Sequence, residues 1–346
     1  MKDDGTKSDP ITYKLKKERN FKIGIITTVP ITHATPAAFY AHQMARTNYY
    51  DIAKELISSD FDYFGDGGFN LPESQLGQIE NLLKENKYNI SKTKEEIQKL
   101  NNKSGKVIAI NPNQKEGLTP FEFETKNDEL KLSDFVKKGI DVLENENGFF
   151  IMVESGMIDY ASHNNDAKSV ISEVNALDNA VKEALNFYNK HKSETLIIVT
   201  GDHETGGLTL GNSTSGYKLN TKILQNQKIS YMTLENYIKE ARTNNYSFEK
   251  VFEYLKENFG MSLSDKSKLY VSQTEINRFA LAYEKGNLNT LLIEFMSKNA
   301  GIGWTTKEHT ASPITVYSIG VGSDKFSGIY STSELNSKLL EILKVK

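Results

Sequence analysis

The sequence predicts an α/β fold in which a mostly parallel sheet is sandwiched between helices. Short apolar runs with strand character alternate with longer segments of helical period. Such alternation is typical of strand–helix–strand units, whose parallel strands are buried on both faces. The chain has 346 residues, 38% of them hydrophobic, which is enough for one large core or for a core with an inserted part.

The predicted strands are short and apolar, and the predicted helices are longer and amphipathic. The strands are expected at residues 21–28 (FKIGIITT), 62–64, 107–110, 149–153 (FFIMV) and 195–200 (TLIIVT). Helical patterns occur at residues 36–44, with Pro36 in the first turn, and at 73–84, 132–143 and 167–189. Residues 86–106 are rich in Lys, Asn and Glu and are predicted to form a solvated helix and loop on the surface.

The amino-acid composition of the sequence changes after residue 210. Residues 211–303 are polar, rich in Asn, Lys and Tyr, and contain helical stretches, and strand character returns at residues 314–319 (ITVYSI). We therefore predict an α/β core at residues 1–210, an inserted helical region at 211–303 and a return to the core at 304–346.

Composition excludes several classes of function and site. The 42 basic and 45 acidic residues give a formal charge of −3, so there is no broad positive field for nucleic acid or anionic lipid. The sequence contains no cysteine, and any metal must therefore be bound by oxygen and nitrogen. No stretch reaches membrane-spanning length, and residues 1–5 lack the apolar core of a signal peptide.

Chelating side chains occur in four short stretches, most of them next to apolar strands. Carboxylates and imidazoles placed in this way are typical of a multinuclear metal site. The candidate ligands are His33 and Thr35, then Glu154, Asp159 and His163, then Asp202 and His203, and finally His309.

Two of these stretches follow predicted strands. Asp159 and His163 are four residues apart, so both lie on one face if the segment is helical. The alternative is an ordinary strand-to-helix loop with a capping Asp and a surface His. Asp202 and His203 come directly after TLIIVT, at the strand end where open α/β sheets build their sites. Their alternative is an N-cap aspartate beside an exposed histidine.

His309 differs because it precedes its strand, ITVYSI. If all candidate ligands meet at one edge of the sheet, this last strand must run antiparallel to its neighbours, which a mixed sheet allows. Arg46 lies near the His33–Thr35 loop, and its planar guanidinium suits two-pronged binding of phosphate. Residues 65–68 (GDGG) could suggest a metal or phosphate loop, but their composition favours a plain turn.

Four motifs together resemble the alkaline phosphatases over essentially the whole chain. They are HATPAAFYAHQMAR, VESGMIDYASH, VTGDHE and EHTASPITVYSIG, in this order and with the long insertion between the last two. The resemblance implies a metal-dependent hydrolase of small phosphate monoesters. It also implies that residues 211–303 correspond to the family's variable crown region, often placed at a homodimer interface, and that complete members are periplasmic or secreted.

The resemblance further implies two Zn²⁺ ions, one Mg²⁺ ion and a role for each candidate residue. The first zinc would be held by Asp159, His163 and His309, and the second by Asp202 and His203 among its ligands. Magnesium would lie near Thr35 and Glu154, with His33 at a variable position beside it. Arg46 would hold the phosphate group.

One departure from the family pattern bears on activity. The resemblance implies a phosphoserine intermediate, formed by the serine of an Asp-Ser-(Ala/Ser)-Ala-Gly type motif, but this sequence contains no Asp-Ser dipeptide. We therefore expect an N-terminally incomplete member with weak or no turnover of its own. The alternatives are a non-catalytic metal- or phosphate-binding remnant, and a related metal-dependent phosphodiesterase or sulfatase-type hydrolase.

Overall fold

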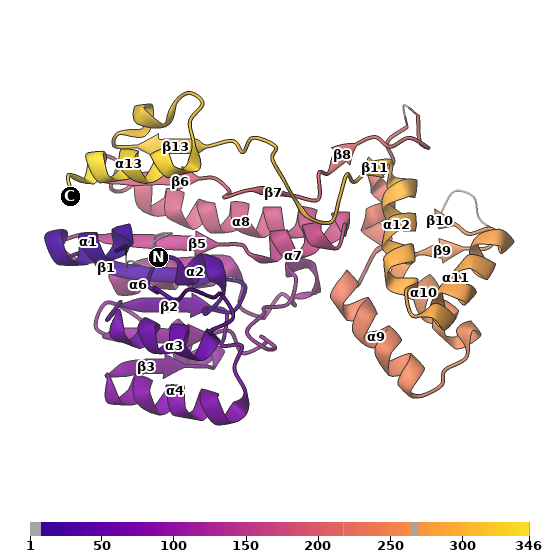
Figure 1. Cartoon of the computed structure of the whole chain (residues 1–346), viewed down its shortest axis with the longest axis horizontal. Coiled ribbons are helices and arrows are strands. Elements are labelled where there is room, and N and C mark those ends of the chain that lie inside the picture. The colour runs from indigo at the N-terminus through magenta and orange to yellow at the C-terminus, as the bar shows by residue number, and fades with distance from the viewer. Residues whose placement is uncertain (1–7, 217, 265–268, 346) are drawn as a thin grey trace.

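A five-stranded parallel sheet forms the centre of the protein (Figure 1). The structure is a computed structural model, and it describes residues 8–216, 218–264 and 269–345. The strands run in the order β3 (Tyr88–Ser91), β4 (Lys106–Ile110), β2 (Tyr63–Asp66), β1 (Lys22–Thr27) and β5 (Phe149–Glu154). All four neighbouring pairs are parallel, as the alternation of strands and helices predicts.

Helices cover both faces of this sheet because its strands are apolar on both faces. On one face, Ile23 and Ile25 of β1 belong to a buried cluster with α1 (Ile11–Arg19), α3 (Tyr49–Ser58) and α4 (Glu73–Glu85). On the other face, Ile26 and Tyr63 lie in a cluster with Phe135 of α6 (Leu132–Leu143), and α8 (Ala167–Tyr188) packs on α6. The sheet is thereby the middle layer of three.

Antiparallel pairing occurs in three short ladders outside the main sheet. β6 (Leu196–Val199) pairs with β13 (Tyr317–Gly320), which confirms the predicted antiparallel last strand. β7 (Glu204–Thr205) pairs with β12 (His309–Thr310), and β8 (Thr209–Leu210) pairs with β11 (Ile302–Gly303). The chain ends in α13 (Thr332–Leu343), which lies beside β13 and β6 (Figure 1).

The predicted insertion contains a helical group with a hydrophobic core of its own. Its elements are α9 (Tyr231–Thr243), α10 (Phe248–Phe259), β9 (Met261–Ser262), β10 (Leu269–Tyr270), α11 (Gln273–Lys285) and α12 (Leu288–Ala300). The chain enters and leaves this group through the β8–β11 ladder (Figure 1). The exact division of the chain into 1–210, 211–303 and 304–346 remains a prediction.

A buried carboxylate joins the helical group to α8. Asp166, only 1% exposed, caps α8 by accepting hydrogen bonds from the backbone N–H and the hydroxyl of Ser169. The same carboxylate accepts from the Gln227 amide at 2.9 Å and from the Tyr231 N–H at 2.9 Å, at the start of α9. Four donors therefore converge on one buried carboxylate at this junction.

The element boundaries predicted from the sequence agree with the structure for most helices and strands and disagree with it at two places. α6 spans the predicted residues 132–143, but the helix predicted at 36–44 is only α2 (Ala34–Ala37). Tertiary contacts replace the rest of that helix: the His42 N–H donates to the Glu55 carboxylate, and the Tyr40 hydroxyl donates to the Ile31 carbonyl. Residues 86–106 contain a helix as predicted, the capped α5 (Lys94–Gln98), but they also contain the edge strand β3, which was not predicted. Throughout the portion of the chain that the structure describes, no helix combines the length and apolarity required to cross a bilayer.

The predicted plain turn at residues 65–68 contains a buried acid. Asp66 ends β2 at φ 77° with 1% of its surface exposed, and its Oδ1 accepts from the Asn111 amide. Its Oδ2 has no hydrogen-bond partner among the residues that the structure describes. Burial raises the pKa of Asp66 to about 7, and it also raises the pKa of Glu173 to about 8.

These raised pKa values predict that the metal-free protein loses stability as the pH rises. The unfolded carboxyl groups release their protons near pH 4 whereas the folded ones retain them, so folding binds protons between about pH 4 and pH 7. We expect the free energy of unfolding to fall by roughly 4 kcal/mol per group across this window, because each pKa unit is worth about 1.4 kcal/mol. Urea unfolding at pH 5, 6, 7 and 8 measures it, and Asp66→Asn should flatten the dependence; an unchanged slope would contradict the assignment.

Candidate metal centre

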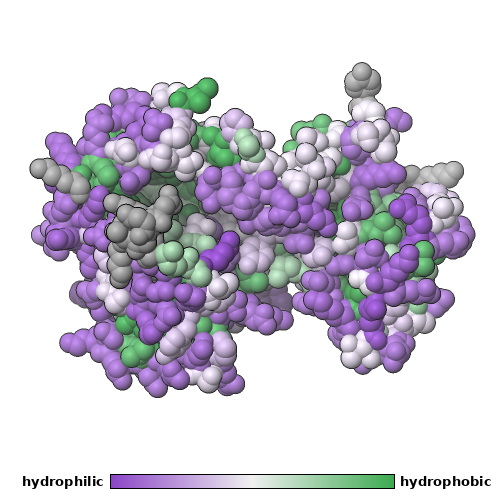
Figure 2. All heavy atoms as spheres, viewed as in Figure 1, coloured by the Kyte–Doolittle hydropathy of each residue, from purple (hydrophilic) through white to green (hydrophobic). Residues whose placement is uncertain are grey.

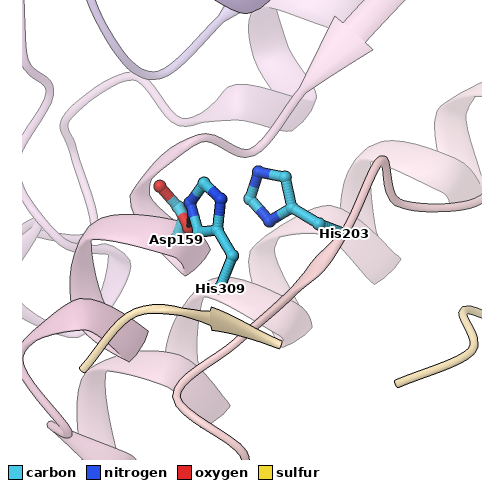
Figure 3. A group of neighbouring side chains, drawn as sticks. All are labelled: Asp159, His203 and His309. Atoms are coloured by element: carbon cyan, nitrogen blue, oxygen red, sulfur yellow. Dashed lines mark ion pairs between the residues drawn. The ribbon is translucent and has the colours of Figure 1, made fainter. Parts of the chain in front are cut away.

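Three side chains from three separate segments point toward one another (Figure 3). They are Asp159, His203 and His309, and one ligand atom from each lies within 4.8 Å of the other two. The rings of His203 and His309 are stacked, with centroids 3.5 Å apart, and the Nε2 of His309 is 3.7 Å from the Asp159 carboxylate. Side chains separated by up to 150 residues in sequence thus form one cluster.

Backbone pairing holds two of these segments together. In the β7–β12 ladder, His309 is paired with Thr205, two residues after His203. A carboxylate reinforces the ladder, because Glu204 accepts hydrogen bonds from the Gly207 N–H and the Thr310 hydroxyl. Asp159 comes from α7 (Met157–His163), which follows β5 directly. The elements that position the cluster therefore start near the ends of β5 and β6.

Polar contacts outside the cluster orient its side chains. The Thr205 hydroxyl donates to Asp159 Oδ1 at 2.6 Å and lies 3.2 Å from His203 Nδ1. The Nδ1 of His163 bonds the Lys307 carbonyl, which leaves its Nε2 facing Asp159 Oδ2 at 3.4 Å. Hydrogen bonds of this kind fix the tautomer and orientation of imidazole ligands in metal sites. Neither Thr205 nor Lys307 was predicted from the sequence, although Thr205 directly follows the DHE motif.

All five candidate zinc ligands are neighbours through these contacts. Asp202 approaches His203, with 3.4 Å between Oδ2 and Nε2. The tightest group, Asp159 with His203 and His309, combines residues that the resemblance divides between two ions. Which residue binds which ion remains a prediction.

The donor set fits zinc. Zinc takes imidazole nitrogens and carboxylate oxygens at about 2 Å, so ligands of one ion lie within roughly 4 Å of each other. The observed ligand atoms need only small side-chain movements to reach that spacing. The cluster is half-buried to exposed, with His309 exposed, which leaves it open to a substrate.

A second group of candidate residues surrounds Glu154 at the end of β5. Its carboxylate accepts hydrogen bonds from the Thr27 hydroxyl at 2.5 Å and from the Thr35 side chain. Burial raises the pKa of Glu154 to about 7 despite these hydrogen bonds. A divalent cation beside Glu154 and Thr35 would favour the ionised carboxylate, so the chemistry of this pair fits the magnesium expected there.

His33 and Arg46 lie together beside this second group. The Nη2 of Arg46 is 2.8 Å from the Nε2 of His33, and the buried Nδ1 of His33 has no hydrogen-bond partner in the described ranges of the chain. Burial, aided by the charge of Arg46, lowers the pKa of His33, so its imidazole is neutral at pH 7. The Arg46 side chain is exposed, as a group that grips a phosphate from solvent requires.

The Thr205 contacts lead to a testable prediction for metal affinity. Replacing Thr205 with valine keeps the β-branched shape and removes the hydroxyl that orients Asp159 and His203. We expect zinc affinity to fall by about 10- to 100-fold, the usual effect of losing such a supporting contact. Isothermal titration with zinc measures it, and Thr305→Val, which removes a hydroxyl bonded to the Gly207 carbonyl, is the matched control.

Comparison with known proteins places the motifs in a family. A family profile described as alkaline phosphatase matches residues 4–64 and 68–345. The chain belongs to the alkaline phosphatase family. It is 28% identical to alkaline phosphatase 4 of Bacillus subtilis over 341 residues, covering 95% of this chain and 68% of the relative. Alkaline phosphatase 3 of the same organism is also 28% identical, covering 99% of this chain and 72% of the relative.

Solved structures of family members share the fold. The cold-active alkaline phosphatase of the psychrophile Shewanella sp. superposes with a TM-score of 0.81 at 26% identity, covering 96% of this chain and 78% of that one. The alkaline phosphatase of the Antarctic bacterium TAB5 gives a TM-score of 0.66 at 27% identity, covering 99% of this chain and 77% of that one. Variants of the TAB5 enzyme are described with bound magnesium. The predicted alkaline-phosphatase-like α/β fold is confirmed.

Proposed function

We propose that this chain binds phosphate monoesters at a centre of two zinc ions and one magnesium ion, and that it does so for hydrolysis. The observation that supports this most strongly is the convergence of Asp159, His203 and His309 from three distant segments. Membership in the alkaline phosphatase family supplies the substrate class and the dependence on metal.

Each group of side chains has a distinct role in this proposal. The cluster of Asp159, His163, Asp202, His203 and His309 would hold the zinc ions, and Glu154 with Thr35 would hold magnesium. Such ions stabilise the attacking and leaving oxygens of an in-line displacement at phosphorus. Arg46 would bind two phosphate oxygens and place the ester against the cluster. Neutral His33 would keep the Arg46 guanidinium aimed at that position.

We further propose that this chain alone binds phosphate esters much better than it turns them over. The sequence contains no Asp-Ser dipeptide, and the family motif implies a serine nucleophile in that context. Without the nucleophile, the chain retains binding groups and lacks the group that would form the phosphoserine. Because these binding groups are present without the nucleophile, a non-catalytic module that binds metal or phosphate is the second candidate function.

Two measurements on the full chain separate the two candidates. The first is isothermal titration with zinc, then with inorganic phosphate in the presence of zinc. The second is hydrolysis of a chromogenic phosphate ester at alkaline pH with added zinc and magnesium. Binding with little turnover is the expected result, turnover typical of the family would refute the missing-nucleophile argument, and absence of zinc binding would refute the proposed centre.

Substitution of Arg46 tests the proposed phosphate contact. Arg46→Ala should weaken phosphate binding by about 10- to 100-fold, because a charge-assisted pair of hydrogen bonds contributes about 1.5–3 kcal/mol. Arg46→Lys keeps the charge but loses the two-pronged geometry, so it should recover only part of the affinity. The measurement is phosphate titration of the zinc-loaded protein. Equal affinity in all three proteins would remove Arg46 from the site, and Arg278→Ala on α11 is the control.

The helical group between β8 and β11 is proposed to be the crown region of this family member and a contact surface in a homodimer. Its position beside the metal centre, rather than within the sheet, is consistent with a peripheral role (Figure 1). Light scattering of the full chain measures the oligomeric state.

A further inference from the structure

The segment that carries Arg46 is exposed and has little support of its own. Residues 41–48, the Arg46 segment, lead into α3 without regular secondary structure, and residues 44–48 are all exposed. Arg46 follows Ala45 in a turn that the Asn48 N–H closes on the Ala45 carbonyl at 3.1 Å. The surface over α3 is largely hydrophilic (Figure 2). Apolar packing therefore does not fix the position of the guanidinium, which depends on polar contacts at the base of the segment.

One carboxylate of α3 holds the base of this segment. Glu55 lies in the second turn of α3, and its carboxylate accepts hydrogen bonds from the His42 N–H and from the Gln43 side-chain amide, the latter at 2.7 Å. The Gln43 side-chain carbonyl in turn accepts from the Asn48 side-chain amide at 3.1 Å. These contacts connect both ends of the Arg46 segment to Glu55, and the turn that carries Arg46 lies between them.

The surroundings of Glu55 keep its carboxylate in place. Its side chain is 21% exposed, and the His42 ring, whose Nδ1 lies 3.3 Å from the carboxylate, is 10% exposed. The Tyr13 ring of α1 lies 5.7 Å from the His42 ring, and the Tyr13 hydroxyl donates to the Tyr40 carbonyl at 2.8 Å. Burial and the nearby charges of Glu55 and Asp9 raise the pKa of Tyr13 to about 12, so this hydroxyl remains a donor at neutral pH. The chain is thus bound to α1 just before the Arg46 segment and to α3 within it.

We propose that Glu55 is a positioning residue, which holds Arg46 at the place where its guanidinium binds the phosphate group. This inference rests on the proposed function. A carboxylate repels a phosphate, so Glu55 can favour phosphate binding only through the segment that it holds. The guanidinium has a second contact at its tip, the Nε2 of His33 at 2.8 Å. Contacts at base and tip together restrict its orientation, which two-pronged binding requires, because a displacement of about 1 Å can cost much of such an interaction.

A double-mutant cycle on the zinc-loaded full chain tests this role, with inorganic phosphate as the probe. Glu55→Ala should weaken phosphate binding by about 3- to 30-fold, part of the roughly 10- to 100-fold loss expected for Arg46→Ala, because the guanidinium is present but poorly placed. In the Arg46→Ala background, the same substitution should change phosphate affinity by less than about twofold. Isothermal titration measures the parent, both single variants and the double variant, and zinc affinity should be the same in each of them.

Two further substitutions separate positioning from a general loss of structure. Gln43→Met removes the amide that links Glu55 to Asn48. Because Gln43 is only half-buried and outside the hydrophobic clusters, this variant should fold as the parent does and still lose part of the phosphate affinity. Asp51→Ala is the matched control on α3, because Asp51 forms an exposed ion pair with Lys54 in the first turn. The control should bind phosphate as the parent does.

Hydrogen exchange of the backbone amides tests the Glu55 contact without metal or phosphate. Glu55→Ala should speed exchange at the His42 amide by at least about tenfold and leave the amides of β1 unchanged. Unchanged exchange at His42, equal phosphate affinity of Glu55→Ala and the parent, or an equal loss with and without Arg46 would overturn the inference. An Arg46→Ala protein that binds phosphate as the parent does would overturn the proposed phosphate contact, and the inference with it.

Discussion

Replacing His309 with alanine is expected to weaken zinc binding by at least about 100-fold, or roughly 2.7 kcal/mol. His309 contacts Asp159 and stacks on His203, so it lies between the other members of the cluster. Removing it deletes one ligand and also the ring that separates the remaining carboxylate and imidazole. A supporting contact alone typically changes affinity by 10- to 100-fold, so loss of a ligand should exceed that range.

Isothermal titration of the full chain with zinc measures this loss. His191→Ala is the matched control, because His191 is also an accessible histidine in contact with carboxylates, Glu144 and Glu194, but it forms no metal cluster with the residues that the structure describes. The control should bind zinc as the parent does. Equal affinity of His309→Ala and the parent would mean that the three side chains are neighbours without being ligands, and the proposed function would lose its main support.

Replacing Asp166 with alanine is expected to destabilise the protein by about 3–5 kcal/mol. The substitution removes the acceptor of the Ser169 hydroxyl and of the Tyr231 N–H, and it removes one of the two acceptors of the Gln227 amide. It also detaches the start of α9 from the cap of α8. Because His163 lies three residues before Asp166, the loop that follows a zinc-ligand candidate should lose its anchor as well.

Urea unfolding of the metal-free chain measures the stability effect. Asp178→Ala is the matched control on the same helix: Asp178 is largely exposed and pairs with Lys182, a type of contact worth less than about 1 kcal/mol. Asp166→Asn keeps one acceptor oxygen and should fall between the two. If Asp166→Ala unfolds at the same urea concentration as the control, the carboxylate does not anchor the junction.

Apolar runs and hydrophobic periodicity predicted those elements whose burial can be inferred from their own residues. The strand FFIMV is a continuous apolar run and the helix at 132–143 shows a clear helical period, and both occur where expected. The helix predicted at 36–44 was wrong because contacts to other segments replace its backbone hydrogen bonds; the Tyr40 carbonyl, for example, accepts from the Tyr13 hydroxyl of α1. The edge strand β3 was missed because YNIS is polar enough to resemble a surface loop.

The candidate site was predictable in its residue types and less so in its geometry. Motifs after strands indicated Asp159 and Asp202, since strand ends meet at one edge of the sheet. Nothing in the sequence indicated that Thr205 or the Lys307 carbonyl would orient ligands, because a hydroxyl or a backbone oxygen has no motif of its own. The buried Asp66 was likewise taken for a turn residue, since burial of a short acidic side chain depends on distant packing.

The two short ladders at the base of the helical group make the geometry of the cluster of Asp159, His203 and His309 independent of the structure of that group. β7 pairs with β12 next to the candidate ligands, and β8 pairs with β11 farther along the chain. The two segments that lead into and out of the helical group are therefore paired with each other in two successive ladders. Insertions, deletions or replacements in the helical group beyond the β8–β11 ladder can therefore occur during evolution while the distance between His203 and His309 stays constant.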